Sequence, residues 1–316
     1  MKTRNLGRSG LRVSAVGLGC NNFGWRIALE PARKVVHRAL DLGITLFDTA
    51  DMYGDGQSEE MLGQALGTRR KDVVLATKFA AAFTGVSGGP FGSRSYILGA
   101  VEASLRRLKT DWIDLYQYHW PDPRTPMEET LRALDDLVHQ GKVRYIGISN
   151  HPAWRVVDAQ WLARRNGLNA FVSCQDEYSL LVRDAERELI PAMGAFGLGL
   201  LPYFPLASGL LTGKYLKGGT LPADARFASE SMGRLGQRYM TQANWAIVER
   251  LQAFCAERGH ALLELAFSWL AASPVVASVI AGATKPEQVE QNVKAIAWEL
   301  GAEDLAEIDQ LTGKAK

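Results

Sequence analysis

The sequence predicts an α/β fold in which eight parallel strands, nearly every one followed by a helix, close into a single (β/α)8 barrel. Strand-like apolar runs alternate with helical patterns along almost the whole chain, and strict alternation with short loops implies a parallel sheet. The 316 residues are enough for such a barrel, which typically needs roughly 250. No linker or break in composition interrupts the alternation, so residues 1–316 are predicted to form one domain.

The first half of the chain begins with a predicted β-hairpin, because short arms flank the turn-forming residues 7–10. Apolar strand-like runs then predict barrel strands at residues 14–18, 44–48, 73–78, 113–119 and 143–149. Apolar residues spaced three and four apart predict helices at 31–42, 58–67, 95–108, 125–141 and 154–165. Gly43 and Gly67 stand where the first two helices should end, as C-cap glycines do.

The second half continues the alternation, with predicted strands at residues 171–175, 198–204 and 275–280. Helices are predicted at 183–196, where Pro191 interrupts the pattern, and at 286–298. Extra helices are predicted at 241–258, 262–272 and 303–311, and the glycine-rich stretch 205–240 is predicted to be a long loop that is either functional or mobile. Residues 265–284 are uncharged and about as long as a membrane span, but a buried helix followed by a buried strand explains them better.

Composition and motifs argue against several other classes of protein. The 36 basic and 34 acidic residues give a net charge of +2, so no strong field favours nucleic acid or a membrane surface. Three widely spaced cysteines argue against a disulfide framework and a zinc site, and suit a reducing cytoplasm. The first residues lack the apolar run of a secretory signal, and we expect a cytoplasmic protein. A doubly wound sheet is less favoured, because Gly17 and Gly19 lack the third glycine of a phosphate-binding fingerprint.

Polar side chains stand at the carboxyl ends of the predicted strands, where the active sites of such barrels lie. Asp48, Lys78 and His119 each end a strand, and Tyr53 follows in the turn after Asp48. A free tyrosine has a pKa near ~10, and a neighbouring ammonium lowers it. We expect Lys78 to make Tyr53 a general acid or base and Asp48 to balance the charge of Lys78. We expect His119 to donate a hydrogen bond to an oxygen that gains negative charge.

Each of these four residues also has a structural explanation when it is taken alone. Asp48 could cap a turn, Lys78 could be solvated, His119 could be packed, and Tyr53 could be an ordinary turn aromatic. Their combination at neighbouring strand ends favours an enzyme that moves a proton at a carbonyl or alcohol oxygen. A metal-dependent barrel hydrolase is a further alternative, but only His119 and His151 lie near strand ends, and no metal site is predicted.

A series of short motifs, in the same order along the chain, resembles the aldo-keto reductase superfamily. The motifs are residues 47–54, 77–78, 118–122, 147–150, 175–181, 209–215 and 282–285. The resemblance extends from the N-terminal hairpin to the last helix. It implies a TIM barrel that works as an NADPH-dependent carbonyl reductase, with Asp48, Tyr53, Lys78 and His119 as its catalytic tetrad.

The resemblance also implies where the nicotinamide cofactor binds. Ser149, Asn150 and Gln175 would hold the carboxamide, and Tyr178 would stack on the nicotinamide ring, although a core position explains Tyr178 equally well. Tyr203, at the end of the seventh strand, is a further predicted cofactor residue. These five side chains come from three successive strand ends.

The phosphates and the adenosine would lie further along the same edge of the barrel. The backbone from Leu206 to Lys214, with Gly209, would cradle the pyrophosphate, and Thr284 and Lys285 would meet the 2′-phosphate at the start of a helix. Other predicted contacts on this side are Gly282, Gln288 and Asn292. The cofactor implied is NADPH or NADP⁺.

Two departures from the family pattern concern this adenosine side. Ala281 stands where the family often has proline, and Gln291 stands where an acidic residue is common. Neither touches the tetrad. They leave NADH as an alternative cofactor.

The predicted substrate is a small carbonyl compound or alcohol, with neither nucleic acid nor a membrane as partner. An apolar rim is predicted from Trp25, Met52, Phe83, Trp120 and Phe227. We expect a monomer or a weak homo-oligomer. The alternative function is a cofactor-binding redox sensor or regulatory subunit with little turnover, similar to channel-associated members of the superfamily, which keep the tetrad.

Overall fold

The computed structural model describes residues 1–80, 90–215 and 238–313, and its main sheet consists of eight parallel strands. In spatial order these are β10 (Val279–Gly282), β3 (Val16–Gly19), β4 (Leu46–Asp48), β5 (Val74–Phe79), β6 (Ile113–Tyr118), β7 (Val143–Ser149), β8 (Ser173–Gln175) and β9 (Gly199–Leu200). A parallel bridge between Leu200 and Val276 joins β9 to the segment before β10, so the two edges of the sheet meet. The predicted (β/α)8 barrel is confirmed.

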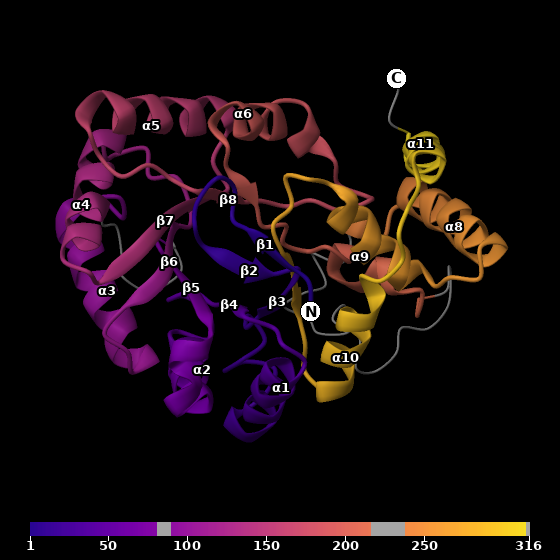
Figure 1. Cartoon of the computed structure of the whole chain (residues 1–316), viewed down its shortest axis with the longest axis horizontal. Coiled ribbons are helices and arrows are strands. Elements are labelled where there is room, and N and C mark those ends of the chain that lie inside the picture. The colour runs from indigo at the N-terminus through magenta and orange to yellow at the C-terminus, as the bar shows by residue number, and fades with distance from the viewer. Residues whose placement is uncertain (81–89, 216–237, 314–316) are drawn as a thin grey trace.

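Helices surround the sheet, as Figure 1 shows. They are α1 (Leu29–Asp41), α2 (Gln57–Leu66), α3 (Arg94–Leu108), α4 (Met127–His139), α5 (Ala153–Asn166), α6 (Leu189–Phe196), α9 (Leu262–Ala272) and α10 (Pro286–Ala295). Two more, α8 (Gln242–Glu257) and α11 (Ala302–Leu311), lie together at one side (Figure 1). Short 3₁₀ turns are η1 (Gly67–Asp72), η2 (Asp184–Glu186) and η3 (Ala207–Thr212).

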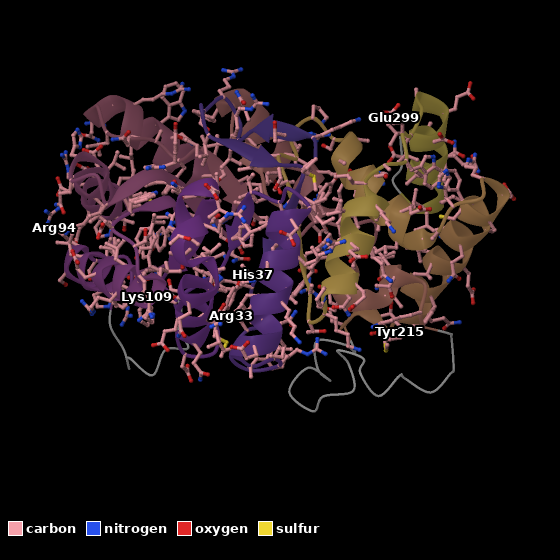
Figure 2. All side chains as sticks on the ribbon, turned by 60° about the horizontal axis from the view of Figure 1, so that its bottom comes forward. Arg33, His37, Arg94, Lys109, Tyr215 and Glu299 are labelled. Atoms are coloured by element: carbon pink, nitrogen blue, oxygen red, sulfur yellow. The ribbon has the colours of Figure 1, made fainter. Side chains whose placement is uncertain are left out.

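The helices pack on the sheet through one apolar face, which α1 illustrates. Val35, Val36 and Ala39 recur at helical spacing and are fully buried, whereas His37 is exposed. Figure 2 shows His37 and Lys109 on the outer surface of the molecule. The main apolar core therefore lies between the helices and the strands, and a second, smaller core fills the barrel.

The N-terminal hairpin closes the amino end of the barrel. Its strands, β1 (Thr3–Asn5) and β2 (Arg12–Ser14), are antiparallel, as predicted. Leu6, Leu11 and Val13 pack with apolar residues from inside the barrel, such as Leu46 and Leu115. Because this end is plugged, a cavity can open only at the carboxyl ends of the strands.

Several predicted boundaries were wrong, and proline accounts for two of them. The predicted helix at 183–196 is divided into η2 and α6, because Pro191 lies in the first turn of a helix that starts at Leu189. The predicted strand at 198–204 forms a continuous ladder only over Gly199–Leu200, since Pro202 has no N–H to continue it, and an isolated bridge follows between Tyr203 and Glu177. The predicted strand at 275–280 is divided between the bridge at Val276 and the ladder of β10 over Val279–Gly282.

The uncharged stretch at 265–284 is divided as predicted between a buried helix, α9, and a buried strand, β10. Among the described residues, every helix is too short or too polar to cross a membrane.

Candidate active site

A buried ion pair lies at the carboxyl ends of β4 and β5. Lys78 is fully buried, and its Nζ donates to Asp48 Oδ2 at 2.7 Å and to the Thr49 carbonyl at 2.7 Å. The third proton of the ammonium reaches Tyr53 Oη at 3.4 Å. Burial alone would lower the pKa of Lys78, but Asp48 and Tyr53 together raise it, so Lys78 remains a cation. The expected pairing of Lys78 with Asp48 and Tyr53 is present.

The second oxygen of Asp48 is held by two amides. Gln175 Nε2 donates to Asp48 Oδ1 at 2.8 Å, and Gln117 Nε2 donates to the same oxygen at 3.1 Å. Asp48 therefore has three donors around it, and its two oxygens have different partners. These three hydrogen bonds hold the carboxylate next to Lys78.

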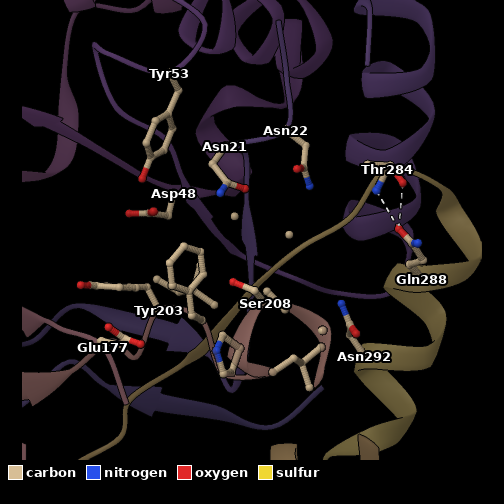
Figure 3. A pocket seen from close by; sticks show the side chains of 18 of the residues that line it. Asn21, Asn22, Asp48, Tyr53, Glu177, Tyr203, Ser208, Thr284, Gln288 and Asn292 are labelled. Atoms are coloured by element: carbon tan, nitrogen blue, oxygen red, sulfur yellow. Dashed lines mark hydrogen bonds between the residues drawn. The ribbon is translucent and has the colours of Figure 1, made fainter. Parts of the chain in front are cut away.

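Tyr53 stands in the turn between β4 and α2, with its hydroxyl directed toward Asp48 (Figure 3). The turn is closed by Gly54 and Gly56, which adopt positive φ values of 58° and 89° that glycine tolerates best. Burial raises the pKa of Tyr53 above its usual value, and the charge of Lys78 offsets this only in part. The lowering effect of Lys78 on this pKa is present as expected, but burial outweighs it. Tyr53 is consequently a protonated phenol at neutral pH, able to donate its proton.

His119 follows β6 and is buried, with its ring in an edge-to-face arrangement with Tyr53 at 6.1 Å between centroids. Burial first, and then the charge of Lys78, lowers the pKa of His119 well below its usual value. The ring is therefore neutral near pH 7, and one ring nitrogen carries a proton. A neutral imidazole beside Tyr53 can donate to a substrate oxygen without adding a second buried cation next to Lys78.

A cavity of about 610 Å³ connects these residues with α10. Figure 3 shows Asp48 and Tyr53 at one end and Thr284, Gln288 and Asn292 at the other. The predicted residues that line it are Asp48, Met52, Tyr53, His119, Trp120, Ser149, Asn150, Gln175, Tyr203, Leu206, Gly209, Lys214, Gly282, Thr284, Gln288 and Asn292. The structure thus brings together most of the residues that the sequence singled out.

A chain of hydrogen bonds runs along one wall of this cavity. Tyr203 Oη donates to Asn150 Oδ1 at 2.8 Å, and Asn150 Nδ2 donates to Ser149 Oγ at 3.0 Å. Ser149 Oγ donates to the Gln175 carbonyl at 2.6 Å, and the Gln175 amide contacts Asp48. The wall is therefore rigid and continuous with the ion pair.

The backbone at η3 forms a strained wall further along the cavity. Ala207, Ser208 and Gly209 have positive φ values of 44°, 56° and 111°, and the first two are unfavourable for residues with a Cβ. Ser208 Oγ is buried and has no hydrogen-bond partner among the described residues. Successive backbone amides in such a turn form a concavity that binds anions, and Lys214 lines the cavity beside it.

The far end of the cavity meets the start of α10. Gln288 Oε1 accepts from the backbone amide of Thr284 at 2.7 Å and from its hydroxyl at 3.2 Å (Figure 3). These bonds occupy the oxygen of Gln288 and leave its amide protons for a ligand. Asn292 is buried one turn later on the same helix.

Some predicted residues lie elsewhere. Tyr178 is absent from the cavity wall, because it is buried against Trp269 at 5.0 Å between rings and its hydroxyl bonds to Glu186. Lys78 contacts Tyr53 but does not itself line the cavity. Trp25 and Lys285 are exposed and do not line the cavity either. Phe83 and Phe227 fall outside the described residues.

Sequence reasoning missed several residues of the site. Asn21, Asn22 and Arg26, from the loop after β3, and Glu177 and Arg238 line the cavity. Gln117 was also missed; it is buried and donates a hydrogen bond to Asp48. The signal for Gln117 was present, since it stands two residues before His119 and so faces the barrel interior.

The described residues include no group of three or more His, Cys, Asp and Glu side chains placed to hold a metal ion. A model of the Aldo/keto reductase family matches residues 15–312. The chain belongs to the aldo/keto reductase family. The predicted resemblance is confirmed.

Proteins that resemble the chain over nearly its whole length carry different names. The probable voltage-gated potassium channel subunit beta of Oryza sativa subsp. japonica is 40% identical, over 94% of this chain and 91% of that protein. The L-glyceraldehyde 3-phosphate reductase of Escherichia coli (strain K12) is 36% identical, over 98% and 92%. The versiconal hemiacetal acetate reductase of Aspergillus parasiticus is 33% identical, over 98% and 96%. An oxidoreductase is the activity class that these reductase relatives support.

Proposed function

We propose that this aldo/keto reductase reduces a small aldehyde or ketone to the alcohol, reversibly, with NADPH as the preferred cofactor. The observation that carries the proposal is the position of Tyr53, a protonated phenol on the cavity wall, 3.4 Å from the ammonium of Lys78. A buried cation beside a phenol stabilises the phenolate that forms when the proton leaves. We also propose that the protein acts in the cytoplasm as a monomer or weak homo-oligomer.

Several features of the cavity support an extended dinucleotide as its ligand. Buried polar atoms without a partner among the described residues, Ser208 Oγ and Asn22 Oδ1, belong to residues that line it. The positive-φ turn at η3 and Lys214 suit a pyrophosphate, and the amide of Gln288 suits a polar group of adenosine. A nicotinamide ring beside Tyr53 would supply the hydride.

Tyr203 is better placed than Tyr178 to contact that ring. Tyr203 lines the cavity opposite Tyr53, and its hydroxyl is fixed by Asn150 (Figure 3). We therefore transfer the proposed ring-contact role from Tyr178 to Tyr203.

The residues of this chain handle the proton. In reduction, Tyr53 donates its phenolic proton to the carbonyl oxygen as that oxygen gains negative charge, and the phenolate is stabilised by Lys78. His119 donates a hydrogen bond to the same oxygen and stays neutral. In oxidation the steps reverse, and Tyr53 returns to the protonated form.

The substrate end of the cavity is bordered by aromatic and apolar groups. Trp120 is 41% exposed and stacks near His119 at 5.9 Å between centroids, and Met52 lines the same cavity. Such a rim excludes water from the reacting oxygen when an apolar substrate binds. We propose aromatic or otherwise apolar carbonyl compounds as the substrate class.

The test uses purified protein with para-nitrobenzaldehyde and either NADPH or NADH, followed by nicotinamide absorbance. We expect turnover with a preference for NADPH. Tyr53→Phe should lower turnover by about 10³-fold, in the range of general acid catalysis, while the affinity for NADPH measured by fluorescence stays unchanged. Retention of most activity by Tyr53→Phe would refute the role of Tyr53.

A regulatory subunit is the second candidate, because relatives at 40% and 38% identity are named probable voltage-gated potassium channel subunits beta. The same experiment separates the two functions. Cofactor binding without turnover on a panel of aldehydes and ketones would favour the regulatory function.

A further inference from the structure

Gln117 occupies a position that apolar residues could fill. It lies on β6 with its side chain fully buried, and its register partners are Lys78 on β5 and Gly147 on β7. A Cβ at Gly147 would lie 3.1 Å from Gln117 Cγ, so the glycine makes room for the longer side chain. The strand neighbours of Gln117 are thus arranged to accommodate it.

The contacts of Gln117 are unequal at the two ends of its amide. Nε2 donates to Asp48 Oδ1 at 3.1 Å, whereas Oε1 is buried without a hydrogen-bond partner among the described residues. A carboxylate only accepts hydrogen bonds, so the nitrogen must face Asp48. An unpaired buried carbonyl costs free energy that leucine would avoid. The retained amide therefore has its use at Asp48.

The protons of Lys78 explain that use. Each of the three has one acceptor, namely Asp48 Oδ2, the Thr49 carbonyl and Tyr53 Oη. The bond to Tyr53 is the longest, at 3.4 Å, and is the easiest to lose if Asp48 turns or moves. Hydrogen bonds from Gln117 and Gln175 to Oδ1 hold the carboxylate in place and draw part of its charge away from the phenol.

We propose that Gln117 is a positioning residue for the proton transfer: its amide holds Oδ1 of Asp48, so that Lys78 pairs with Oδ2 alone and keeps its third proton for Tyr53. The role in catalysis rests on the proposed reductase function. Gln175 shares the contact, but it also lines the cavity and would meet the cofactor directly. Gln117 does not line the cavity, so its replacement tests the positioning effect alone.

The test replaces the amide with a side chain of similar size, in Gln117→Leu and Gln117→Met. Without the amide, Asp48 directs more negative charge at Tyr53, and the phenolate is harder to form. The pH at which the rate of alcohol oxidation reaches half of its maximum should rise by about one unit. The rate of alcohol oxidation at neutral pH should therefore fall about tenfold. The affinity for NADPH and the reduction rate at low pH should stay near the wild-type values, and Tm should not fall.

Gln160→Leu is the matched control. Gln160 is also a buried glutamine, but it lies on α5 and donates to the Phe171 carbonyl at 2.8 Å, away from the cavity. This variant should lower Tm and leave the pH profile unchanged. The Gln117 variants should therefore change proton transfer without a loss of Tm, whereas Gln160→Leu should lower Tm without a change in proton transfer.

A second measurement follows the ionisation of Tyr53 in the absence of turnover. In protein labelled with ¹³C at tyrosine Cζ, the Tyr53 resonance is assigned by its loss in Tyr53→Phe, and its ionisation is followed with pH. Gln117→Leu should move this ionisation upward. Unchanged profiles and resonance, or a loss of Tm and activity together in both leucine and methionine variants, would overturn the proposal. If the wild type turned over no carbonyl, the reductase function would fail, and the Tyr53 resonance would still decide the role of Gln117.

Discussion

Two buried ion pairs, at opposite ends of the barrel, use similar groups for different purposes. Lys78 and Asp48 lie at the carboxyl ends of the strands, with side chains 0% and 5% exposed. Arg70 and Asp114 lie toward the amino ends, 9% and 2% exposed, and are joined at 2.8 Å. Burial is nearly the same in both pairs, so burial alone does not distinguish the pair beside the cavity from the pair at the other end.

The surrounding contacts make the difference. Asp114 accepts four donors: Arg70 and the Leu75 amide on one oxygen, and Arg144 and the Trp112 indole on the other. Both guanidinium groups also lie over the Trp112 ring, at 4.6 and 4.8 Å. At the other end, Lys78 has a long third bond to a phenol that lines a cavity. A closed set of contacts stabilises the fold, whereas an incomplete one can respond to a substrate.

Removing one cation from each pair is the strongest test of this comparison. Lys78→Met and Arg70→Met each leave a buried carboxylate with one partner fewer, and each should lower the free energy of unfolding by about 3 kcal/mol or more. Only Lys78→Met should also lower turnover, by about 10³-fold. Denaturant unfolding and steady-state kinetics measure the two effects. Full activity in Lys78→Met would contradict the proposal that only the ion pair at the carboxyl ends of the strands is needed for activity.

The carboxyl groups Asp51 and Asp114 sharpen the comparison. Asp51 is buried two residues before Tyr53, and its Oδ1 has no partner among the described residues. Burial, and then the charge of Glu59, raises the pKa of Asp51 to about 7. Because the folded-state pKa lies above the unfolded one, Asp51 destabilises the fold progressively as pH rises from about 4 to about 7.

Replacing the two carboxyl groups should therefore have opposite results at about pH 8. Asp51→Asn should raise the free energy of unfolding by about 3 kcal/mol, because it removes a poorly solvated charge. Asp114→Asn should lower it by a similar amount, because it leaves two arginines without their carboxylate. The gain in Asp51→Asn should vanish below about pH 4. A destabilised Asp51→Asn at high pH would show that Asp51 has a partner that compensates its charge.

The smallest expected effect concerns His151, which follows the carboxyl end of β7. His151 Nδ1 lies 2.7 Å from the Ser149 carbonyl, and burial lowers its pKa to about 4. The folded-state pKa is below the unfolded value, so stability present above pH ~6.5 is lost as pH falls toward 4.

Between about pH 7 and pH 5, His151 should contribute a loss of about 2 kcal/mol to the wild type, opposite in sign to the contribution of Asp51 over the same interval. His151→Gln should lack this loss, so its free energy of unfolding should change more favourably from about pH 7 to about pH 5 than that of the wild type. His37→Gln, which changes an exposed histidine, serves as the control. Urea unfolding at each pH measures the difference. Identical pH slopes in wild type and His151→Gln would exclude this source of acid sensitivity.

Much of the fold and the tetrad could be predicted from local patterns. Alternating strand and helix periods specified the barrel, and the position of a polar residue at a strand end specified Asp48, Lys78 and His119. These features depend on residues close together in the chain, which a sequence displays directly. Boundaries failed where one residue changed the pairing, as Pro202 did in the strand after α6.

Other features depended on contacts between distant strands. Tyr178 and Tyr203 are both tyrosines near strand ends, yet only Tyr203 lines the cavity, because Trp269 of α9 buries Tyr178. The net direction of the Tyr53 pKa depended on the extent of burial, which no local pattern reports.

The sequence by itself determined the barrel, the order of its strands and the polar groups delivered to one end. Only the tertiary structure decided how those groups share protons, and Gln117 is the clearest case. It lies 69 positions from Asp48 in the chain, and its hydrogen bond appears only when β4 and β6 pair on either side of β5 in the closed sheet. Periodicity fixes which way a side chain points, but closure of the sheet fixes which side chain it meets.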